Sequence, residues 1–183
     1  MNKIPVLCIG LLVCPICTIA AIYLTHSHWD HIADARELKH ETNAPLFIHP
    51  DDEYRLEEPM SHTIWQLPFT IESVTADYYL HHGDQIRCGE WNFSVCHTPG
   101  HTEGGVCFID KLHSVAIVGD SLFAGSVGRT DLPGGNTDVL IESIANHLLT
   151  LPDNIVFFAG HGEISTIGDE RMFNPFLLGI NTL

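Results

Sequence analysis

The chain has 183 residues, an apolar fraction of 45% and a charged fraction of 17%, values that suit one globular domain and argue against wholesale disorder. Its formal net charge is -15 with only 8 lysines and arginines, which argues against nucleic-acid binding by phosphate neutralisation. The six cysteines do not follow the spacing of a small disulfide-rich scaffold, so we expect a reducing, cytoplasmic location.

The beginning of the chain is strongly apolar. Pro5–Leu24 carries no charged residue and is long enough for a membrane helix. Gly10 and Pro15 interrupt the segment, and it runs without a spacer into polar residues, so we interpret it as buried strands. A membrane anchor or signal sequence and a non-native start stay open as alternatives. Cys14–Cys17 has the CxxC form but lacks the strand-helix context of a redox motif, which favours a packed or incidental pair.

A cluster of metal-ligand side chains follows directly. Residues 19–24 predict a short buried strand, and the segment Thr25-His26-Ser27-His28-Trp29-Asp30-His31 comes next. On a tight loop at a strand end, His26 and His28 can point one way while Asp30 and His31 point to a neighbouring position. Two adjacent metal ions are the natural interpretation, and a surface cluster of titrating histidines is the alternative.

The next elements are a helix, a strand and an irregular segment. Ile32, Ala35 and Leu38 recur at helical spacing, which predicts an amphipathic helix that begins near Asp30. Residues 44–48 predict a second buried strand, and 51–68 predict a loop with a short helix. We interpret the two histidines of this region, His49 and His62, as ordinary polar residues.

The second half of the chain predicts mainly β structure. Short runs separated by turn signals indicate strands at 85–88, 91–97, 105–110 and 114–119. A glycine-rich loop at 125–135 precedes a helix capped by Asn136 or Thr137, with Leu140, Ile141, Ile144 and Leu148 on one apolar face. A last buried strand is predicted at 155–158. Because neighbouring strand residues face opposite sides, we expect no joint metal role for His81 and His82. This order predicts a layered α/β domain.

Further candidate ligands stand at the ends of later predicted strands. They are His101 in Pro99-Gly100-His101-Thr102, Asp120 in Gly119-Asp120-Ser121 and His161 in Gly160-His161-Gly162. With the first cluster they make five imidazoles and two carboxylates. Nitrogen and oxygen ligands without cysteine suit zinc and tolerate iron or manganese.

In this order, the motifs resemble the metallo-β-lactamase superfamily. Segments 127–135 and 164–177 are similar to short bacterial glyoxalase II proteins. The resemblance implies an α/β fold, the four-layer αβ/βα sandwich, in a single domain over 1–183, with 19–183 matching the family and 1–18 atypical. The family's Asp-Pro-Gly-like turn is not found before the first ligands, so we expect the N-terminal strands to be partly missing.

The resemblance also implies a role for each ligand. His26, His28 and His101 would hold one metal ion, Asp30, His31 and His161 a second, and Asp120 would bridge both. Two dications lower the pKa of a shared water, and the resulting hydroxide, oriented by Asp30, would attack a carbonyl. Arg129 could attract a glutathione carboxylate, and an ion pair with Asp131 is the alternative.

The expected function is therefore hydrolysis of a thioester of the S-(2-hydroxyacyl)glutathione type, with two divalent ions, zinc first, as cofactors. A persulfide dioxygenase with one iron held by His26, His101 and Asp120 is the runner-up. Lactone or β-lactam hydrolysis and a non-catalytic metal-binding domain also stay open. We expect a small-molecule partner, no nucleic acid and no membrane, and the sequence leaves a homodimer open.

Overall fold

The computed structural model describes residues 19–179, and the chain divides into two compact units, Met1–Leu80 and His81–Leu183. The expectations for 1–18, including the missing N-terminal strands and the Cys14–Cys17 pair, lie outside the described residues. Within 19–179, none of the helices has the length and apolar character needed to cross a membrane.

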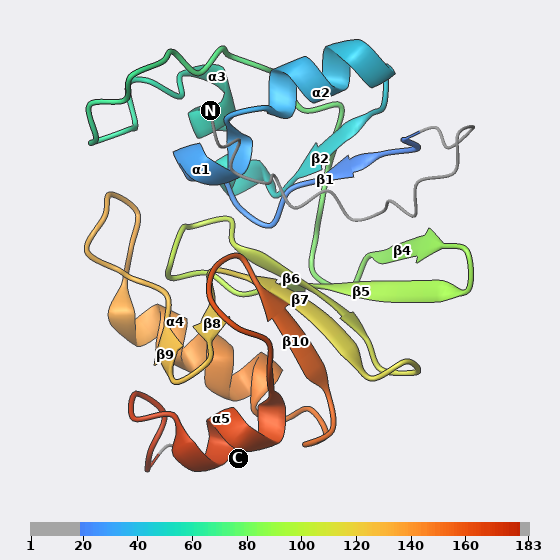
Figure 1. The fold of residues 1–183 in the computed structure, drawn as a ribbon, viewed down its shortest axis with the longest axis vertical. Helices are drawn as coiled ribbons and strands as arrows, with labels where there is room; N and C mark the ends of the chain where they lie inside the picture. Colours follow the sequence, from blue (N-terminus) through green and yellow to red (C-terminus); the bar gives the residue numbers. More distant parts are fainter. Residues whose placement is uncertain (1–18, 180–183) are drawn as a thin grey trace. The chain divides into compact units, whose positions relative to one another are not determined.

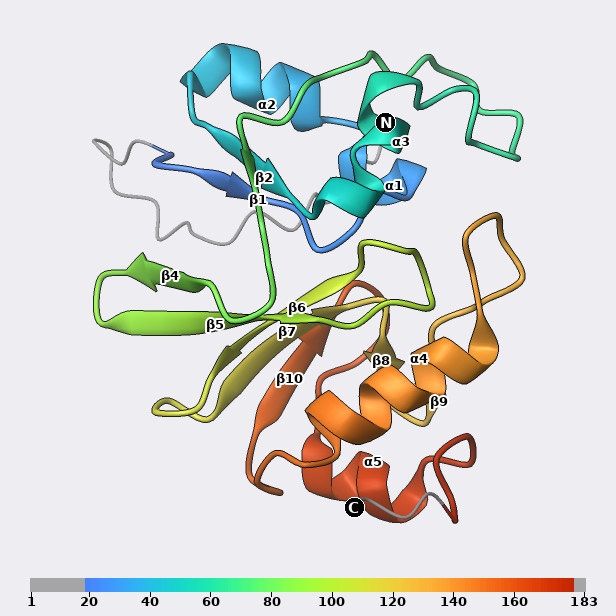
Figure 2. The ribbon, with the colours of Figure 1, turned by 180° about the vertical axis from the view of Figure 1, so that it is seen from behind.

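The first unit is built on a small parallel sheet. Its strands are β1 (Ile22–Tyr23), β2 (Leu46–Ile48) and β3 (Tyr78–Tyr79), paired in that order. The helical elements are α1 (Trp29–Ile32), α2 (Ala35–Thr42), the 3-10 turn η1 (Pro50–Asp52) and α3 (Tyr54–Glu57). Figures 1 and 2 show α2 along one face of the β1–β2 pair. Both strands predicted in this half are confirmed, although each is shorter than its apolar run.

The predicted helix from Asp30 is divided in two. Ala33 and Asp34 form a turn between α1 and α2, with Asp34 at φ -106° and ψ 7°, outside helical geometry. Ile32 and Ala35, on either side of the turn, are both buried in the core of this unit. The break separates the short turn that carries Asp30 from the longer α2.

The second unit contains a six-stranded sheet in the order β11-β10-β7-β6-β5-β4. The strands are β4 (Gln85–Cys88), β5 (Trp91–His97), β6 (Val106–Asp110), β7 (Val115–Gly119), β10 (Val156–Ala159) and β11 (Ser165–Thr166). A separate hairpin joins β8 (Leu122–Phe123) to β9 (Ser126–Val127). The sequence predicted β4 and β5 with the bounds observed and β6, β7 and β10 within one residue at each end, but it did not predict β8, β9 or β11.

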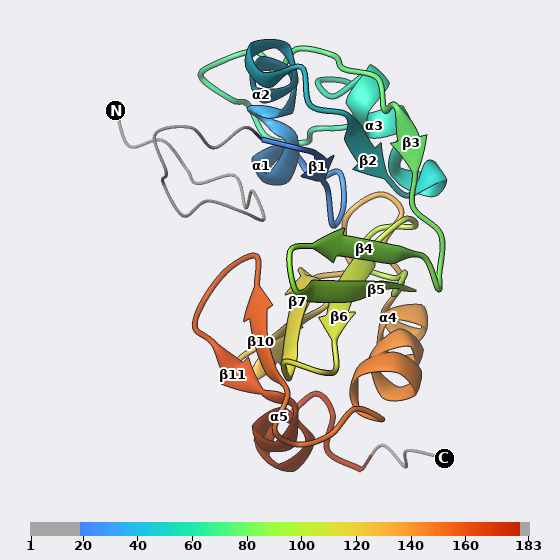
Figure 3. The same ribbon diagram turned by 90° about the vertical axis from the view of Figure 1, so that its right-hand side faces the viewer.

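Helices cover one face of this sheet (Figure 3). Asn136 caps α4 (Thr137–Ser143) by accepting a hydrogen bond from the Val139 amide at 3.2 Å, and the helix continues into a π-helical turn, η2 (Ile144–Leu148). The predicted apolar face is confirmed, because Leu140, Ile144 and Leu148 are fully buried in the core together with residues of α5 (Ile167–Phe173).

The pairing of β7 with β10 positions two of the candidate ligands. These strands run parallel, with Ala159 opposite Gly119, and the Gly160 amide donates to the Gly119 carbonyl at 2.8 Å. Asp120 and His161 therefore leave the sheet at the same edge, one from each strand end.

Candidate metal centre

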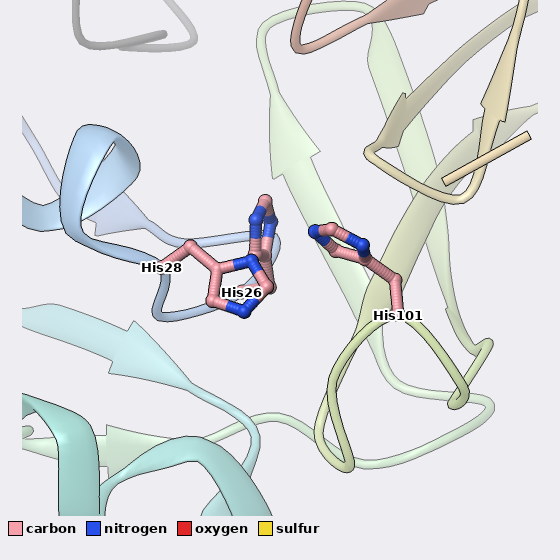
Figure 4. A group of neighbouring side chains, drawn as sticks. All are labelled: His26, His28 and His101. Atoms are coloured by element: carbon pink, nitrogen blue, oxygen red, sulfur yellow. The ribbon is translucent and has the colours of Figure 1, made fainter. Parts of the chain in front are cut away.

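The first ligand set lies on the loop after β1 and on α1. The rings of His26 and His28 meet edge to face with centroids 5.1 Å apart, and the His26 and His31 rings lie 4.0 Å apart. Asp30 Oδ2 is 3.8 Å from His31 Nε2. The structure thus gathers three imidazoles and one carboxylate on this loop of the first unit. Figure 4 shows His26 and His28 on this loop and His101 on the turn that follows β5.

A buried carboxylate that the sequence did not reveal supports this loop. The Ser27 amide, between the two histidines, donates to Asp52 Oδ2 at 2.8 Å. Arg55 donates to the other oxygen of Asp52 at 3.3 Å, and both charged side chains are buried. Asp52 stands in a polar segment beside Asp51, so the sequence carried no signal that one of the two is buried. The ion pair fixes the backbone between His26 and His28.

The second ligand set lies at strand ends of the second unit. His101 Nε2 and His161 Nε2 each lie 3.6 Å from the same oxygen of Asp120, Oδ2. Ligand atoms around a tetrahedral zinc ion, bonded at about 2.0–2.1 Å, are roughly 3.4 Å apart. Each separation suits two ligands of one metal ion, so the donor set of this unit fits metal binding with Asp120 as a ligand shared by both histidines.

The ring of His101 is held in the orientation that a metal ligand needs. Its Nδ1 lies 2.7 Å from the carbonyl oxygen of Arg129, so this nitrogen carries the hydrogen and donates it. Nε2 then keeps its lone pair for a metal, an arrangement typical of ligating histidines. Gly128 makes the approach possible, because a Cβ at this position would collide with the Asp120 carbonyl and lie 3.1 Å from His101 Nδ1.

The helix α4 fixes the turn that carries His101. Gly100 has φ +124°, and a Cβ there would collide with the backbone of Leu140. Ser143 donates to the Pro99 carbonyl at 2.8 Å, and the Asn136 amide donates to the Gly100 carbonyl at 2.8 Å. The glycine beside His101 therefore serves close packing on α4 as well as a sharp turn.

A buried network holds the β8–β9 hairpin that follows Asp120. Glu170 on α5 accepts hydrogen bonds from the Gly125 amide at 2.8 Å and from Ser165 Oγ at 2.5 Å. Asn174 donates to Glu170 at 2.8 Å and to the Ser126 carbonyl at 2.9 Å. Both side chains are buried. They lie in the segment 164–177, whose likeness to a known family was the only signal of their importance.

The side chain of Arg129 is engaged within its own loop. Its guanidinium donates two hydrogen bonds to Asp131, at 2.7 and 2.8 Å. The bond from Arg129 holds the pKa of the Asp131 carboxyl at about 2, and Asp131 in turn raises the pKa of Arg129. The structure has the ion pair that the sequence offered as the alternative to substrate binding.

His49 and His62, the two histidines of the segment after β2, make local contacts. His49 accepts from the Asp51 amide at 3.3 Å at the start of η1, and the His62 ring lies edge-on to Tyr54 with centroids 4.7 Å apart. These contacts agree with their interpretation as ordinary polar residues.

Comparison with known proteins identifies the family. Residues 6–161 match the family model of the metallo-beta-lactamase superfamily. The chain belongs to this superfamily. The predicted α/β metallo-β-lactamase fold and the coarse class of metal-dependent hydrolase are thereby confirmed.

Individual relatives of this superfamily member are similar over most of its length. The hydroxyacylglutathione hydrolase GloC of Haemophilus influenzae is 38% identical over 159 residues, which cover 85% of this chain and 74% of GloC. Among solved structures, BLEG-1 B3 metallo-beta-lactamase has a TM-score of 0.80 at 39% identity, covering 87% of this chain and 77% of BLEG-1. TTHA1623 in a di-iron-bound form has a TM-score of 0.77 at 36% identity, covering 86% of this chain and 77% of TTHA1623.

Proposed function

We propose that this metallo-beta-lactamase superfamily member hydrolyses a thioester of the S-(2-hydroxyacyl)glutathione type to a 2-hydroxy acid and a free thiol. The observation that carries the proposal is the pair of ligand sets at strand ends, in a chain 38% identical to a hydroxyacylglutathione hydrolase. Zinc is the first candidate metal, and the di-iron form of TTHA1623 makes iron the second.

The ligand assignment follows from the family and the donor chemistry. We assign one ion to His26, His28 and His101, and the other to Asp30, His31 and His161. Asp120 would serve both ions, and its position 3.6 Å from His101 and from His161 supports that role.

Two bound divalent ions would supply a water that ionises near neutral pH and a positive charge for the developing oxyanion. The chain's own residues have separate tasks. Asp30 would accept a hydrogen bond from the attacking water and so orient it toward the carbonyl carbon. The Arg129 carbonyl accepts the hydrogen on Nδ1 of His101, which holds the ring in one orientation and leaves Nε2 as the nitrogen for a metal ion.

Two other reactions, β-lactam hydrolysis and persulfide oxidation, can be distinguished from thioester hydrolysis. BLEG-1 is named a metallo-beta-lactamase, which favours β-lactam hydrolysis as the second candidate. A persulfide dioxygenase with one iron would have less use for His161, whereas His161 lies as close to Asp120 as His101 does. The metal count therefore separates a two-ion hydrolase from a one-iron oxygenase.

The test is metal analysis of the purified full chain combined with three assays: S-lactoylglutathione hydrolysis, hydrolysis of a chromogenic β-lactam, and persulfide-dependent oxygen consumption. We expect two ions per chain and turnover of the thioester. His101→Ala should lose metal and reduce kcat/KM by about 100-fold or more, because a ligand is removed outright.

The matched control is His40→Ala, which removes a histidine whose side chain is 82% exposed, on α2. It should keep both metal and activity. If His101→Ala kept metal content and hydrolysis, the ligand assignment would be wrong. If the loaded protein turned over only the β-lactam or the persulfide, the thioester proposal would be wrong.

A further inference from the structure

A second cluster of metal-ligand side chains lies within the second unit. His82 stands in the turn before β4, Cys96 on β5 and His147 in the π turn η2. One imidazole nitrogen of each histidine and the Cys96 sulfur all lie within 4.8 Å of one another. We propose that His82, Cys96 and His147 form an additional binding site for a divalent metal ion, with zinc as its preferred occupant.

Three separate segments converge on this cluster. Cys96 is buried on the face of β5 that packs against Ile144 and Leu148. His147 lies between those two residues in the π turn, whose Leu149 amide donates to the Ile144 carbonyl at 2.9 Å. Interruptions of this kind are frequent at functional sites, because they reorient side chains. The π turn places the centroid of the His147 ring 5.2 Å from the centroid of the His82 ring. Because His82 is exposed, an ion can reach this site from solvent.

The donor chemistry suits zinc. One thiolate and two imidazoles are borderline-soft ligands, and zinc accepts three protein ligands with water in the fourth position. Bonds of about 2.3 Å to sulfur and 2.0–2.1 Å to nitrogen need only an inward shift of about 1 Å by the side chains. None of the three residues belongs to the ligand set assigned to hydrolysis, which contains no cysteine.

Before an ion can bind, the protons and hydrogen bonds of the three ligand side chains have to be taken into account. Burial, with His82 and His97 nearby, lowers the pKa of His147 and keeps its imidazole neutral, the form that binds metal. Burial raises the pKa of the Cys96 thiol to about 12, so metal binding must release this proton. The His97 amide donates to His82 Nδ1 at 3.3 Å, a long hydrogen bond that a metal ion at this ring has to displace or accommodate.

An ion at this site would join β5 and the turn before β4 to the end of the helix that starts with α4. The same helix contacts the His101 turn through Ser143 and Asn136. The site would therefore brace the support of a hydrolytic ligand without contacting the reacting atoms.

The test uses cobalt(II), because a thiolate-to-cobalt charge-transfer band in the near ultraviolet requires a cysteine ligand. The full chain is prepared with Cys8, Cys14, Cys17 and Cys88 replaced by serine, so that Cys96 and Cys107 are its only thiols. We expect the band in this background, its loss on Cys96→Ser, and its retention on Cys107→Ser. Cys107 is the matched control because it lies directly opposite Cys96 on β6 and is also buried.

A second variant decides the question if either buried serine unfolds the chain. His82→Gln changes an exposed side chain and should lower the cobalt affinity by about tenfold or more. The affinity is measured by titration of the same charge-transfer band. Absence of the band from the background protein, its survival in folded Cys96→Ser, or unchanged cobalt affinity in His82→Gln would each overturn the proposal.

Discussion

The Nδ1 atom of His101 lies 2.7 Å from the carbonyl oxygen of Arg129, a residue far along the chain. This hydrogen bond makes a backbone atom, and not the Arg129 guanidinium, the group that orients the ligand. The guanidinium is held by Asp131 instead. The support for His101 therefore does not depend on the side chain at position 129, provided that the loop keeps its backbone conformation.

The first prediction concerns Gly128, which lets that loop pass the ligands. Gly128→Ala places a methyl group against the Asp120 carbonyl and His101 Nδ1, so both ligands must move. We expect lower metal content and a kcat/KM reduced by about 10-fold to 100-fold, the usual effect of disturbing a ligand's support. Arg129→Ala is the control, because it keeps the carbonyl and should retain full metal content. Full metal loading in Gly128→Ala would contradict this explanation.

The second prediction concerns the buried pair beneath the first ligand loop. Asp52→Ala removes the acceptor of the Ser27 amide and the carboxylate partner of Arg55, with both charged residues buried. Breaking such a pair costs about 3–5 kcal/mol, so chemical denaturation should show a loss of this size. Asp51→Ala, at a neighbouring carboxylate that is 58% exposed, should cost no more than about 1 kcal/mol. Equal losses in the two variants would show that the buried pair has no special role.

The third prediction concerns the network under the β8–β9 hairpin. Glu170→Ala removes the acceptor shared by the Gly125 amide, Ser165 and Asn174. Leaving buried donors unsatisfied costs about 1–3 kcal/mol per group, so the midpoint of thermal unfolding should fall clearly. Glu142→Ala, at an exposed carboxylate of α4, should leave the midpoint unchanged. A wild-type midpoint in Glu170→Ala would rule out the proposed support.

The fourth prediction concerns acid stability and Asp110. Burial alone raises the pKa of this carboxyl, but hydrogen bonds from the His113 side chain and from the Asn92 and His113 amides outweigh burial and hold the pKa at about 2, below the ordinary 3.8. A lowered folded-state pKa contributes stability that is present above the unfolded value and is lost as the pH falls through the folded one. The contribution should therefore disappear between about pH 4 and pH 2.

Urea unfolding of metal-free protein across that range measures the effect. Asp110→Asn should be less stable than the wild type at neutral pH, and the difference should shrink on acidification. Asp131→Asn provides a comparison, because the pKa of Asp131 is also about 2 but its side chain is 69% exposed, so its contribution should be smaller. If the difference in the free energy of unfolding between Asp110→Asn and wild type did not change with pH, the stabilising role of the Asp110 carboxylate would be refuted.

Much of the second unit could be predicted from local pattern. Alternating apolar residues between clear turn signals gave β4 and β5 their observed bounds, and the spacing of Leu140, Ile144 and Leu148 gave the buried face of α4. The π turn was not predictable, because its residues keep the same i, i+4 apolar spacing as an ordinary helix. The strands β8 and β9 were too short for a periodic signal.

The first candidate ligands were visible as a cluster of histidine and aspartate after an apolar run, and the later ones because histidine or aspartate stood beside glycine at a predicted strand end. Their supports were not. Asp52 and Gly128 act through contacts with residues distant in sequence, namely Ser27 and the Asp120–His101 pair, and a single sequence gives no sign of such contacts. The likeness to a known family reached Glu170 and Asn174 as parts of a motif, while the structure gave their physical role.

The parallel pairing of β7 with β10 also sets when the second ligand set can form during folding. The β6–β7 pair needs only a short turn, whereas β10 reaches β7 after the chain has passed through the β8–β9 hairpin and α4. Long loop closure slows strand pairing, so we expect His161 to join Asp120 late. Metal that binds only the completed edge would stabilise the strand pair that forms last, and the free energy of unfolding of the sheet would then rise with the metal concentration.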